Sequence, residues 1–311
     1  MKTGVLAIAL ALAGAVASLL LLESMSPTLV FWMLVGAVAV VSWIGLERLA
    51  CIDKPRWIAA LLVPGLFGLL LLYLWQVLTV GFEVPAILLP SPARIGHQLA
   101  NNLDLEWQDF RQTFLKSVLA GFTLGSGLGF LVAILVDRSP FLQRGLLPLG
   151  ALVSAIPVVG IAPIMVMWFG FDWQSKAAVI VVMTFFPMLV NTLAGLAAAS
   201  AIERDLMHSY AAGYGQTLAK LRLPIALPFV FNALKINSTL ALIGGIVAEF
   251  FGTPVVGMGF RISVEIGRMN VDMVWATIAV AALAGSVFYG ILALIERGFT
   301  FWHPSYRQER N

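Results

Sequence analysis

The chain has 311 residues, of which 60% are hydrophobic and only 11% are charged, and its formal net charge is +3. Soluble domains carry about 25% charged residues, so this composition excludes a soluble protein of this size. The small basic excess does not indicate nucleic-acid binding, because Lys and Arg residues of membrane proteins collect on cytoplasmic segments. The single cysteine, Cys51, excludes an internal disulfide, and His97, His208 and His303 lack the spacing of metal ligands.

Eight apolar runs have about the 20-residue length that a membrane-spanning helix needs. They predict an all-α polytopic integral membrane protein with about eight transmembrane helices. The first run is longer than the apolar part of a cleaved signal peptide, and a second run follows at once, which favours a span. In chain order the runs are 3–22, 28–46, 57–80, 112–136, 145–170, 175–198, 227–248 and 272–295.

The Lys and Arg residues set the expected orientation. With eight spans and the N-terminus inside, twelve of the 19 lie on inside segments, six lie on outside segments, and Lys235 lies within a span. Both termini and residues 199–226 are therefore expected in the cytoplasm. Segments 81–111 and 249–271 are expected outside, as surface connections or as contacts for an extracytoplasmic partner.

Charge density divides the chain near residue 50. The first two runs are simple and joined by a short turn, whereas the later runs have longer connections. We expect an accessory N-terminal transmembrane hairpin at 1–50 and the working domain at 51–311.

Small residues in the fourth run have a four-residue spacing, at Gly121, Gly125 and Gly129. They form a flat stripe that lets another backbone approach closely. That backbone belongs either to another helix of this chain or to a second copy.

Polar and helix-breaking residues within the later runs are candidates for a translocation path. Broken helices often line cavities, and polar intramembrane side chains usually face the bundle interior. The alternatives are simple kinks and hydrogen bonds between helices. For Lys235 they are snorkelling to the interface or facing a cavity, and Glu249 is expected to mark the outer edge of its run. The path candidates are Ser154, Pro157, Pro163, Asn191, Asn237 and Thr239.

The segment 199–226 is polar and helix-patterned. Ser200 and Glu203 have the spacing of a capping box, which predicts a helix over about 201–212. Ile202, Leu206 and Tyr210 recur every four residues and share one face. Such a stripe either fills a groove on a partner or lies at the membrane interface.

The rest of this segment predicts a turn and a second helix. Gly213 and Gly215 supply turn chemistry, and residues 216–221 have the pattern of a short helix. Leu223 and Pro224 then begin the next span, because proline is tolerated in a first helical turn.

Aligned on Leu223-Pro224, this segment resembles the signature cytoplasmic loop of binding-protein-dependent ABC importer permeases. The family pattern is Glu-Ala-Ala, three residues, Gly, then nine residues to Ile-x-Leu-Pro. This chain has Asp205, Leu206 and Met207 at the Glu-Ala-Ala position and Ala211 at the Gly position. Because both depart from the pattern, the turn is expected to move to Gly213 or Gly215.

Other stretches extend the resemblance over roughly 57–305. ILLPSPARI, AIPVVGIAPIMVMWFG, FFPMLVNTLAGL and AEFFGTPVVGMGF resemble the nitrate/sulfonate/taurine class of these permeases. Within it, LMHSYAAG, LKINSTLALIGGIVAEFFG and the terminal FWHPSYR are most similar to the pyrimidine-precursor (hydroxymethylpyrimidine) or riboflavin branch.

The resemblance implies a six-helix type I permease core in a bacterial inner membrane, surrounded by lipid. Two copies, as a homodimer, would enclose a path for a small solute delivered by a periplasmic or lipid-anchored binding protein. ATP and Mg would bind a separate ABC ATPase, so this chain would be neither an enzyme nor a cofactor carrier. Residues 203–215 would dock onto that ATPase, through Glu203, Asp205, Leu206, Tyr210, Ala211, Gly213 and Gly215, with Leu223 and Pro224 following.

Two other function classes fit the sequence less well. An ion-coupled secondary transporter usually needs an intramembrane acidic residue, and no predicted span has a central Asp or Glu. A membrane enzyme needs clustered catalytic groups, which the three isolated histidines do not supply.

Overall fold

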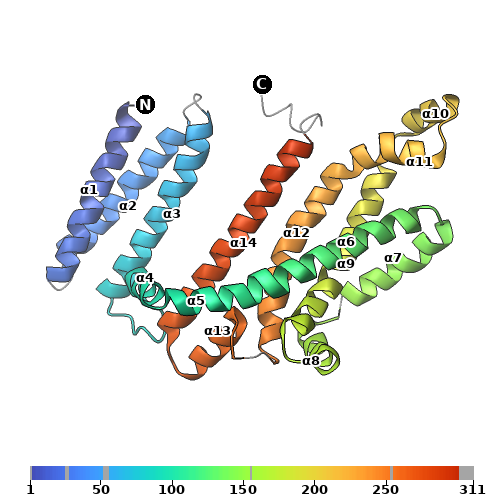
Figure 1. Ribbon diagram of the computed structural model, residues 1–311. Coiled ribbons are helices and arrows are strands. Elements are labelled where there is room, and N and C mark those ends of the chain that lie inside the picture. Colours follow the sequence, from blue (N-terminus) through green and yellow to red (C-terminus); the bar gives the residue numbers. More distant parts are fainter. Residues whose placement is uncertain (1, 25–27, 52–55, 155, 253–254, 301–311) are drawn as a thin grey trace. The chain divides into compact units, whose positions relative to one another are not determined.

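The computed structural model describes residues 2–24, 28–51, 56–154, 156–252 and 255–300. Every regular element within these ranges is helical, as predicted. The chain forms two compact units, one of residues 1–101 with 269–276 and one of residues 102–268 with 277–311 (Figure 1).

Six stretches of the described residues are long and apolar enough to cross a membrane. The apolar part of the first helix, Leu6–Leu22, is shorter. The membrane-spanning character predicted from composition is thus confirmed. The six stretches are Leu29–Ala50, Leu62–Gly81, Leu103–Asp137, Trp173–Ala197, Tyr214–Glu249 and Val271–Phe299.

The first unit is built on a pair of packed helices, α1 (Lys2–Ser24) and α2 (Leu29–Ala50). Helix α3 (Arg56–Gly81) joins them, and the hydroxyls of Ser18 and Tyr73 lie 2.7 Å apart in a hydrogen bond between α1 and α3. Buried Phe31, Val35 and Val77 form the local core. The hairpin at 1–50 therefore packs on α3, while its role as a separate domain remains a prediction.

Helix α4 (Pro92–Asn101) completes the first unit with the start of α14 (Val271–Phe299). Arg94 donates to Asp272 from Nη2 at 2.8 Å, and the rings of Trp75 and Trp275 meet edge to face. The segment 81–111 begins without regular structure, as its prolines predict, and is helical from Pro92 onward.

The second unit begins with one continuous helical run made of α5 (Leu103–Phe110), the π-helix η1 (Arg111–Val118) and α6 (Leu119–Asp137). Residues 103–111, which were expected in an outside connection, are helical and continue directly into the predicted fourth span. The remaining helices are α7 (Pro140–Ser154), α8 (Val158–Phe169), α9 (Trp173–Ala197), α10 (Ala201–Ser209), α11 (Tyr214–Thr217), η2 (Leu218–Arg222), α12 (Leu223–Glu249) and α13 (Met258–Gly267).

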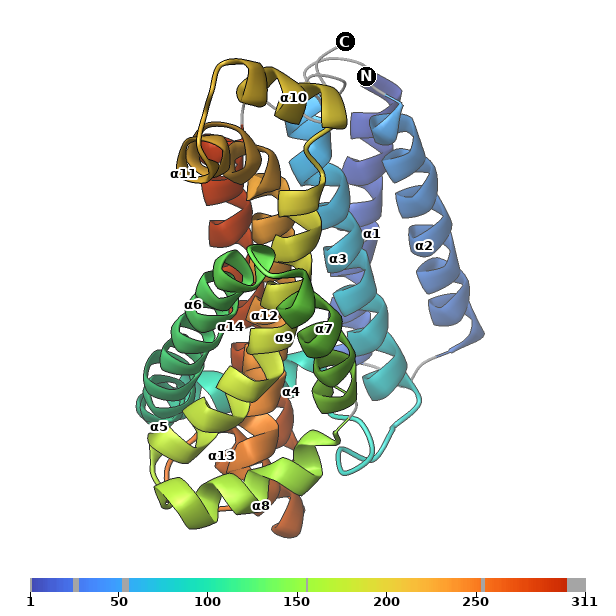
Figure 2. The same ribbon diagram turned by 90° about the vertical axis from the view of Figure 1, so that its right-hand side faces the viewer.

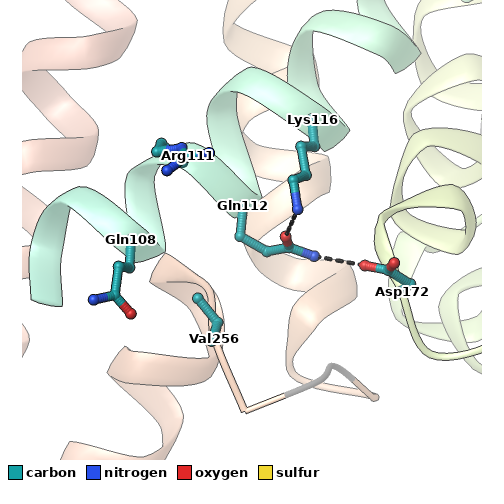
Figure 3. A pocket seen from close by; sticks show the side chains of 6 residues that line it. All are labelled: Gln108, Arg111, Gln112, Lys116, Asp172 and Val256. Carbon is teal, nitrogen blue, oxygen red and sulfur yellow. Dashed lines mark hydrogen bonds between the residues drawn. The ribbon is translucent and has the colours of Figure 1, made fainter.

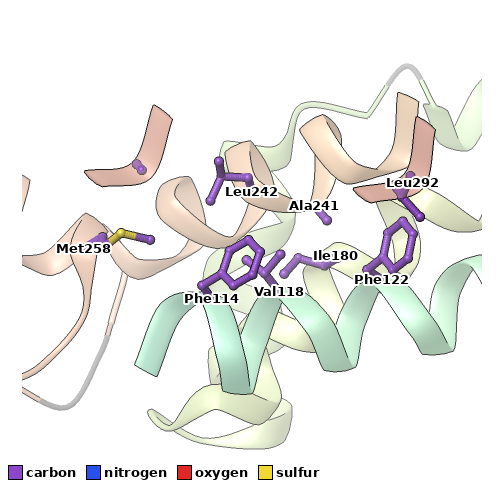
Figure 4. Packing of buried hydrophobic residues seen from close by; sticks show 9 residues of the cluster. Phe114, Val118, Phe122, Ile180, Ala241, Leu242, Met258 and Leu292 are labelled. Carbon is purple, nitrogen blue, oxygen red and sulfur yellow. The ribbon is translucent and has the colours of Figure 1, made fainter. Parts of the chain in front are cut away.

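Helix α9 is the centre of the second unit, because α6 and α12 both pack along it. A Cβ atom added at Gly125 would lie 2.9 Å from the Cα atom of Val181, and one at Gly121 would lie 2.9 Å from the carbonyl of Ala177. The glycine stripe thus serves packing within this chain, one of the two alternatives. A buried cluster around Phe114, Ile180 and Leu242 fills the space beside it (Figure 4).

The apolar run 145–170 forms two helices rather than one span. Helix α7 ends at Ser154 and α8 begins at Val158, with Pro157 in extended conformation as its N-cap. Neither helix is long enough to cross a membrane. The run is thus broken at Pro157 and not merely kinked, which was one of the two interpretations. A second break, at Pro163, does not occur because that proline lies inside α8.

Candidate functional site

Helix α10 is built by local capping. The hydroxyl oxygen of Ser200 accepts the amide of Glu203 at 3.3 Å, and the Glu203 carboxylate accepts the amide of Ser200 at 2.8 Å. The capping box predicted from the spacing is therefore confirmed. The bond from the Ser200 amide and a second one from the Ser200 hydroxyl, also at 2.8 Å, lower the pKa of the exposed Glu203 carboxyl because they favour its charged form.

One face of α10 is apolar and exposed. The exposed fractions of Ile202, Leu206 and Tyr210 are 82%, 55% and 78%, and no residue of the helix is buried. Figure 2 shows α10 and α11 beyond the ends of α9 and α12. The predicted shared face is thus present, and none of the described residues buries it.

The turn after α10 differs from the expectation. Ala211 adopts a left-handed φ of 53°, and its amide donates to the carbonyl of His208 at 2.9 Å. The amide of Ala212 donates to the carbonyl of Met207 at 3.0 Å, which completes a Schellman motif. The helix therefore ends at Ser209 rather than near residue 212.

The two glycines do not form this turn. Gly213 has a φ of −69° and caps α11, while Gly215 lies within α11. The expectation that the turn moves to one of them is wrong, because the Schellman hydrogen bonds close two residues earlier. Ala211, at the position where the family pattern has glycine, takes the left-handed conformation itself.

The second predicted helix is present and merges with the next span. Helix α11 and the π-helix η2 cover residues 214–222, and α12 begins at Leu223 with Pro224 in its first turn. The predicted start at Leu223-Pro224 is confirmed. Asp205 lies on α10 and is exposed.

A half-buried group of polar side chains, here called the joint, connects α11 and η2 to the membrane helices. Arg222 donates from Nη1 and Nη2 to the two carboxylate oxygens of Asp137, both at 2.7 Å. Its Nε donates to the carbonyl of Leu196 at 2.9 Å, and the hydroxyl of Tyr214 donates to Asp137 at 2.9 Å. The Arg138 guanidinium lies 4.5 Å from the centre of the Tyr214 ring. The joint therefore links α11 and η2 with the ends of α6 and α9.

Sequence reasoning missed this joint. Arg138 and Arg222 counted only among the Lys and Arg residues that predict the orientation, and the sequence pattern did not point to Asp137. The available signal was a lone carboxylate at the end of an apolar run and an arginine directly before Leu223-Pro224. A charge at such a position needs a partner if it is buried.

The predicted path residues do not form one group. Asn237 is fully buried and donates to the Ser126 hydroxyl at 2.9 Å and the Thr184 carbonyl at 2.7 Å. It therefore holds α12 against α6 and α9. A hydrogen bond between helices was the alternative to a place in the translocation path. Thr239 is exposed on α12, and half-buried Asn191 donates to the carbonyl of Pro187.

The other path candidates lie around the break between α7 and α8. Pro157 and Pro163 are exposed, and Ser154 is the last residue of α7, with its side chain outside the described part of the structure. Two further residues have partners that the sequence did not predict. Lys235 pairs with Glu296 at 2.7 Å. Glu249, the last residue of α12, is buried and accepts from the Thr113 hydroxyl and the Gly259 amide.

The comparisons with known proteins identify the family to which the chain is similar. A family model described as "Binding-protein-dependent transport system inner membrane component" matches residues 125–301. The riboflavin transport system permease protein RibX of Chloroflexus aurantiacus is 33% identical, over 83% of this chain and 96% of its own length. The formylaminopyrimidine transport permease protein ThiX of Halalkalibacterium halodurans is 32% identical, over 78% and 96%. A putative aliphatic sulfonates transport permease protein SsuC of Bacillus subtilis is 29% identical, over 80% and 89%. The terminal stretch FWHPSYR, which was part of the resemblance, lies outside the described residues.

Proposed function

This chain belongs to the family of binding-protein-dependent transport system inner membrane components, and from that membership we propose that α10 docks onto a separate ATPase subunit. The observation that carries the proposal is the exposed apolar face of Ile202, Leu206 and Tyr210 on a helix with no buried residue. An amphipathic helix of this kind fits a hydrophobic groove through anchors one turn apart. ATP and Mg would bind the ATPase and not this chain.

The joint of Asp137, Tyr214 and Arg222 supports a path for coupling. A displacement of α10 would be transmitted to α11 through the two-residue link after Ala211. From there the half-buried ion pair of Asp137 and Arg222 would transmit it to α6, and the hydrogen bond of Arg222 to Leu196 would transmit it to α9. A paired and nearly buried arginine is suited to this because its two parallel hydrogen bonds fix direction as well as distance. The ATPase would have to bind α10 differently in its open and closed states to drive transport.

The remaining features of the importer follow as parts of the same proposal. Two copies of the chain would enclose the path in the inner membrane, with the N-terminal hairpin as an accessory, and a binding protein would deliver the solute. The excess of Lys and Arg on segments expected inside supports cytoplasmic termini. The names of the relatives support a small solute, such as a sulfonate, riboflavin or a pyrimidine precursor of thiamine.

The test places a charge on the docking face. In Leu206→Glu the carboxylate would have to be desolvated in the groove, so we expect uptake in cells to fall at least about tenfold. The amount of permease in the membrane and its unfolding temperature should not change, because Leu206 is exposed. Co-purification of the ATPase should fall in parallel with uptake.

The matched control is Arg204→Glu, which introduces a carboxylate on the opposite side of α10 and should retain ATPase binding. Tyr210→Pro is a second disruption, because proline distorts the cap of the helix. Normal transport by Leu206→Glu or Tyr210→Pro would contradict docking through this face. Loss of both transport and folded protein would point to a structural role for α10 instead.

A further inference from the structure

The second unit has an open cavity of about 380 Å³ beside η1, which we call the η1 cavity. This size is within the range of small-molecule sites. Four of its lining residues lie on α5 and η1, one precedes α9 and one lies before α13 (Figure 3). The lining residues are Gln108, Arg111, Gln112, Lys116, Asp172 and Val256.

The polar groups of the η1 cavity are mostly donors. Lys116 donates to the side-chain oxygen of Gln112 at 2.9 Å, and the Gln112 amide nitrogen donates to Asp172 at 2.7 Å. An ammonium has three N–H donors, so this geometry fixes Lys116 with further donors available. Arg111 is exposed, and its side chain makes no hydrogen bond or ion pair with any residue that the structure describes.

The one carboxylate of the cavity is already engaged. Asp172 accepts from Gln112 and also caps α9 by accepting the amide of Trp173 at 2.8 Å. These bonds lower the pKa of Asp172, with the bond from Gln112 the main cause, so it remains ionised. The cavity therefore has an excess of hydrogen-bond donors, on Arg111, Lys116 and Gln108. Its one carboxylate does not offset them, because the bonds of Asp172 are directed away from Arg111.

The position of the cavity in the chain argues for contact with water and solute. Arg111 and Lys116 lie in the charged N-terminal part of the helical stretch Leu103–Asp137, ahead of the apolar section that is long enough to span a membrane. The distribution of Lys and Arg predicts that this is the outer end of the span, where a solute would arrive. The backbone there is π-helical, and π-helical turns are frequent at functional sites.

We infer that the η1 cavity is an oxyanion-binding subsite, which receives the sulfonate, carboxylate or phosphate group of a solute on its way through the permease. Arg111 would bind two oxygens in its planar fork, and Lys116 and Gln108 would donate to the remaining one. The inference rests on the proposed importer function for its place in transport. The subsite itself concerns equilibrium binding and needs no ATPase.

The test compares two thiol reagents at one position of the full chain in lipid nanodiscs. Cys51 is first replaced by serine, and Gln108→Cys then places a thiol in the cavity. Methanethiosulfonates carrying a sulfonate or a trimethylammonium are allowed to react, and the ratio of their rates is divided by the same ratio for free cysteine. A subsite for oxyanions should raise this normalised ratio at least about tenfold, because two cations attract one reagent and repel the other.

Three variants separate the subsite from general surface charge. Arg111→Gln and Lys116→Gln should each lower the ratio about threefold or more, while Arg111→Lys should retain most of it. Arg204→Gln on α10 removes a cation at the other end of the unit and should leave the ratio unchanged. Sulfate should slow the sulfonate reagent more than chloride does at equal ionic strength.

The outcomes that overturn the inference are distinct from failure of the importer function. A ratio near one, or equal slowing by sulfate and chloride, would show that the cavity does not select oxyanions. A raised ratio that returns to about one when a binding protein is added would assign the cations to contact with acidic groups of that protein. Failure of ATP-driven uptake alone would leave the subsite standing and would contradict only the proposed function.

Discussion

Two short helices of the second unit connect long spans, yet they are held in opposite ways. Helix α13 has ten residues, of which five are buried, and Asp109 and Glu249 bind its first turn. Helix α10 has nine residues and none is buried. The difference teaches that α13 derives its position from the membrane helices, whereas α10 depends on its own caps and, in the proposed assembly, on a partner.

The largest effect is expected where a buried charge loses its partner. Arg261 of α13 donates from Nε to Asp109 at 2.8 Å, and the Asp109 side chain is fully buried. Arg261→Met should lower the free energy of unfolding by about 3–5 kcal/mol, because an uncompensated carboxylate is left inside. Denaturant unfolding in detergent micelles would measure the change.

The matched control is Arg268→Met, since Arg268 also pairs with a carboxylate, that of Glu265, but its side chain is 66% exposed. Its loss should cost less than about 1 kcal/mol. Equal losses in the two variants would mean that α13 is not anchored by the Asp109 pair.

A medium effect is expected where helices of the body touch through backbone. In Gly125→Ala the new methyl group would meet the Cα atom of Val181 on α9, so we expect a loss of about 1–3 kcal/mol in unfolding free energy. Gly127→Ala lies two residues away and meets nothing within 4 Å. Its expected change is a small gain, because alanine favours a helix over glycine. Both variants are measured by the same unfolding experiment. If Gly127→Ala were the less stable of the two, the contact between α6 and α9 would be misplaced.

The contrast between α13 and α10 also explains what the sequence could predict. The capping box of Ser200 and Glu203 and the apolar face of α10 are relations over three or four residues, so local spacing was sufficient. The pairs of Asp137 with Arg222 and Asp109 with Arg261 span 85 and 152 residues. A local pattern can single out one such charge, as at Asp137, but it cannot identify a partner that is so distant in the sequence.

The misplaced turn has a different origin. Glycine is the usual residue in left-handed conformation, so composition pointed to Gly213 and Gly215. The position of the turn is set instead by which amides can reach the carbonyls of Met207 and His208. Ala211 meets that requirement at a steric cost, which a sequence pattern does not reveal.

A smaller effect should arise from relieving that cost. Ala211→Gly removes the Cβ atom that makes the left-handed conformation unfavourable and should stabilise the end of α10 by about 1 kcal/mol. Amide hydrogen exchange of residues 207–212 should become slower by up to about tenfold. Gly213→Ala is the comparison, since Gly213 has a negative φ and open space around it. A strong response to Gly213→Ala and none to Ala211→Gly would place the turn at Gly213 after all.

The smallest effect concerns pH, and it tests whether α10 depends on its caps. Because hydrogen bonds from Ser200 lower the pKa of Glu203, the capping contribution is fully present above the ordinary glutamate pKa of 4.5. It is lost as the pH falls through the lower pKa of the folded helix, so exchange of the α10 amides, corrected for intrinsic rates, should accelerate there. Glu203→Gln keeps an N3 side chain that can cap but cannot titrate, so its protection should stay flat over the same pH range. Helix α13, whose position is set by buried neighbours, has no box of this kind. If its amides responded at the same pH as those of α10, the change would be a global loosening and not the titration of one cap.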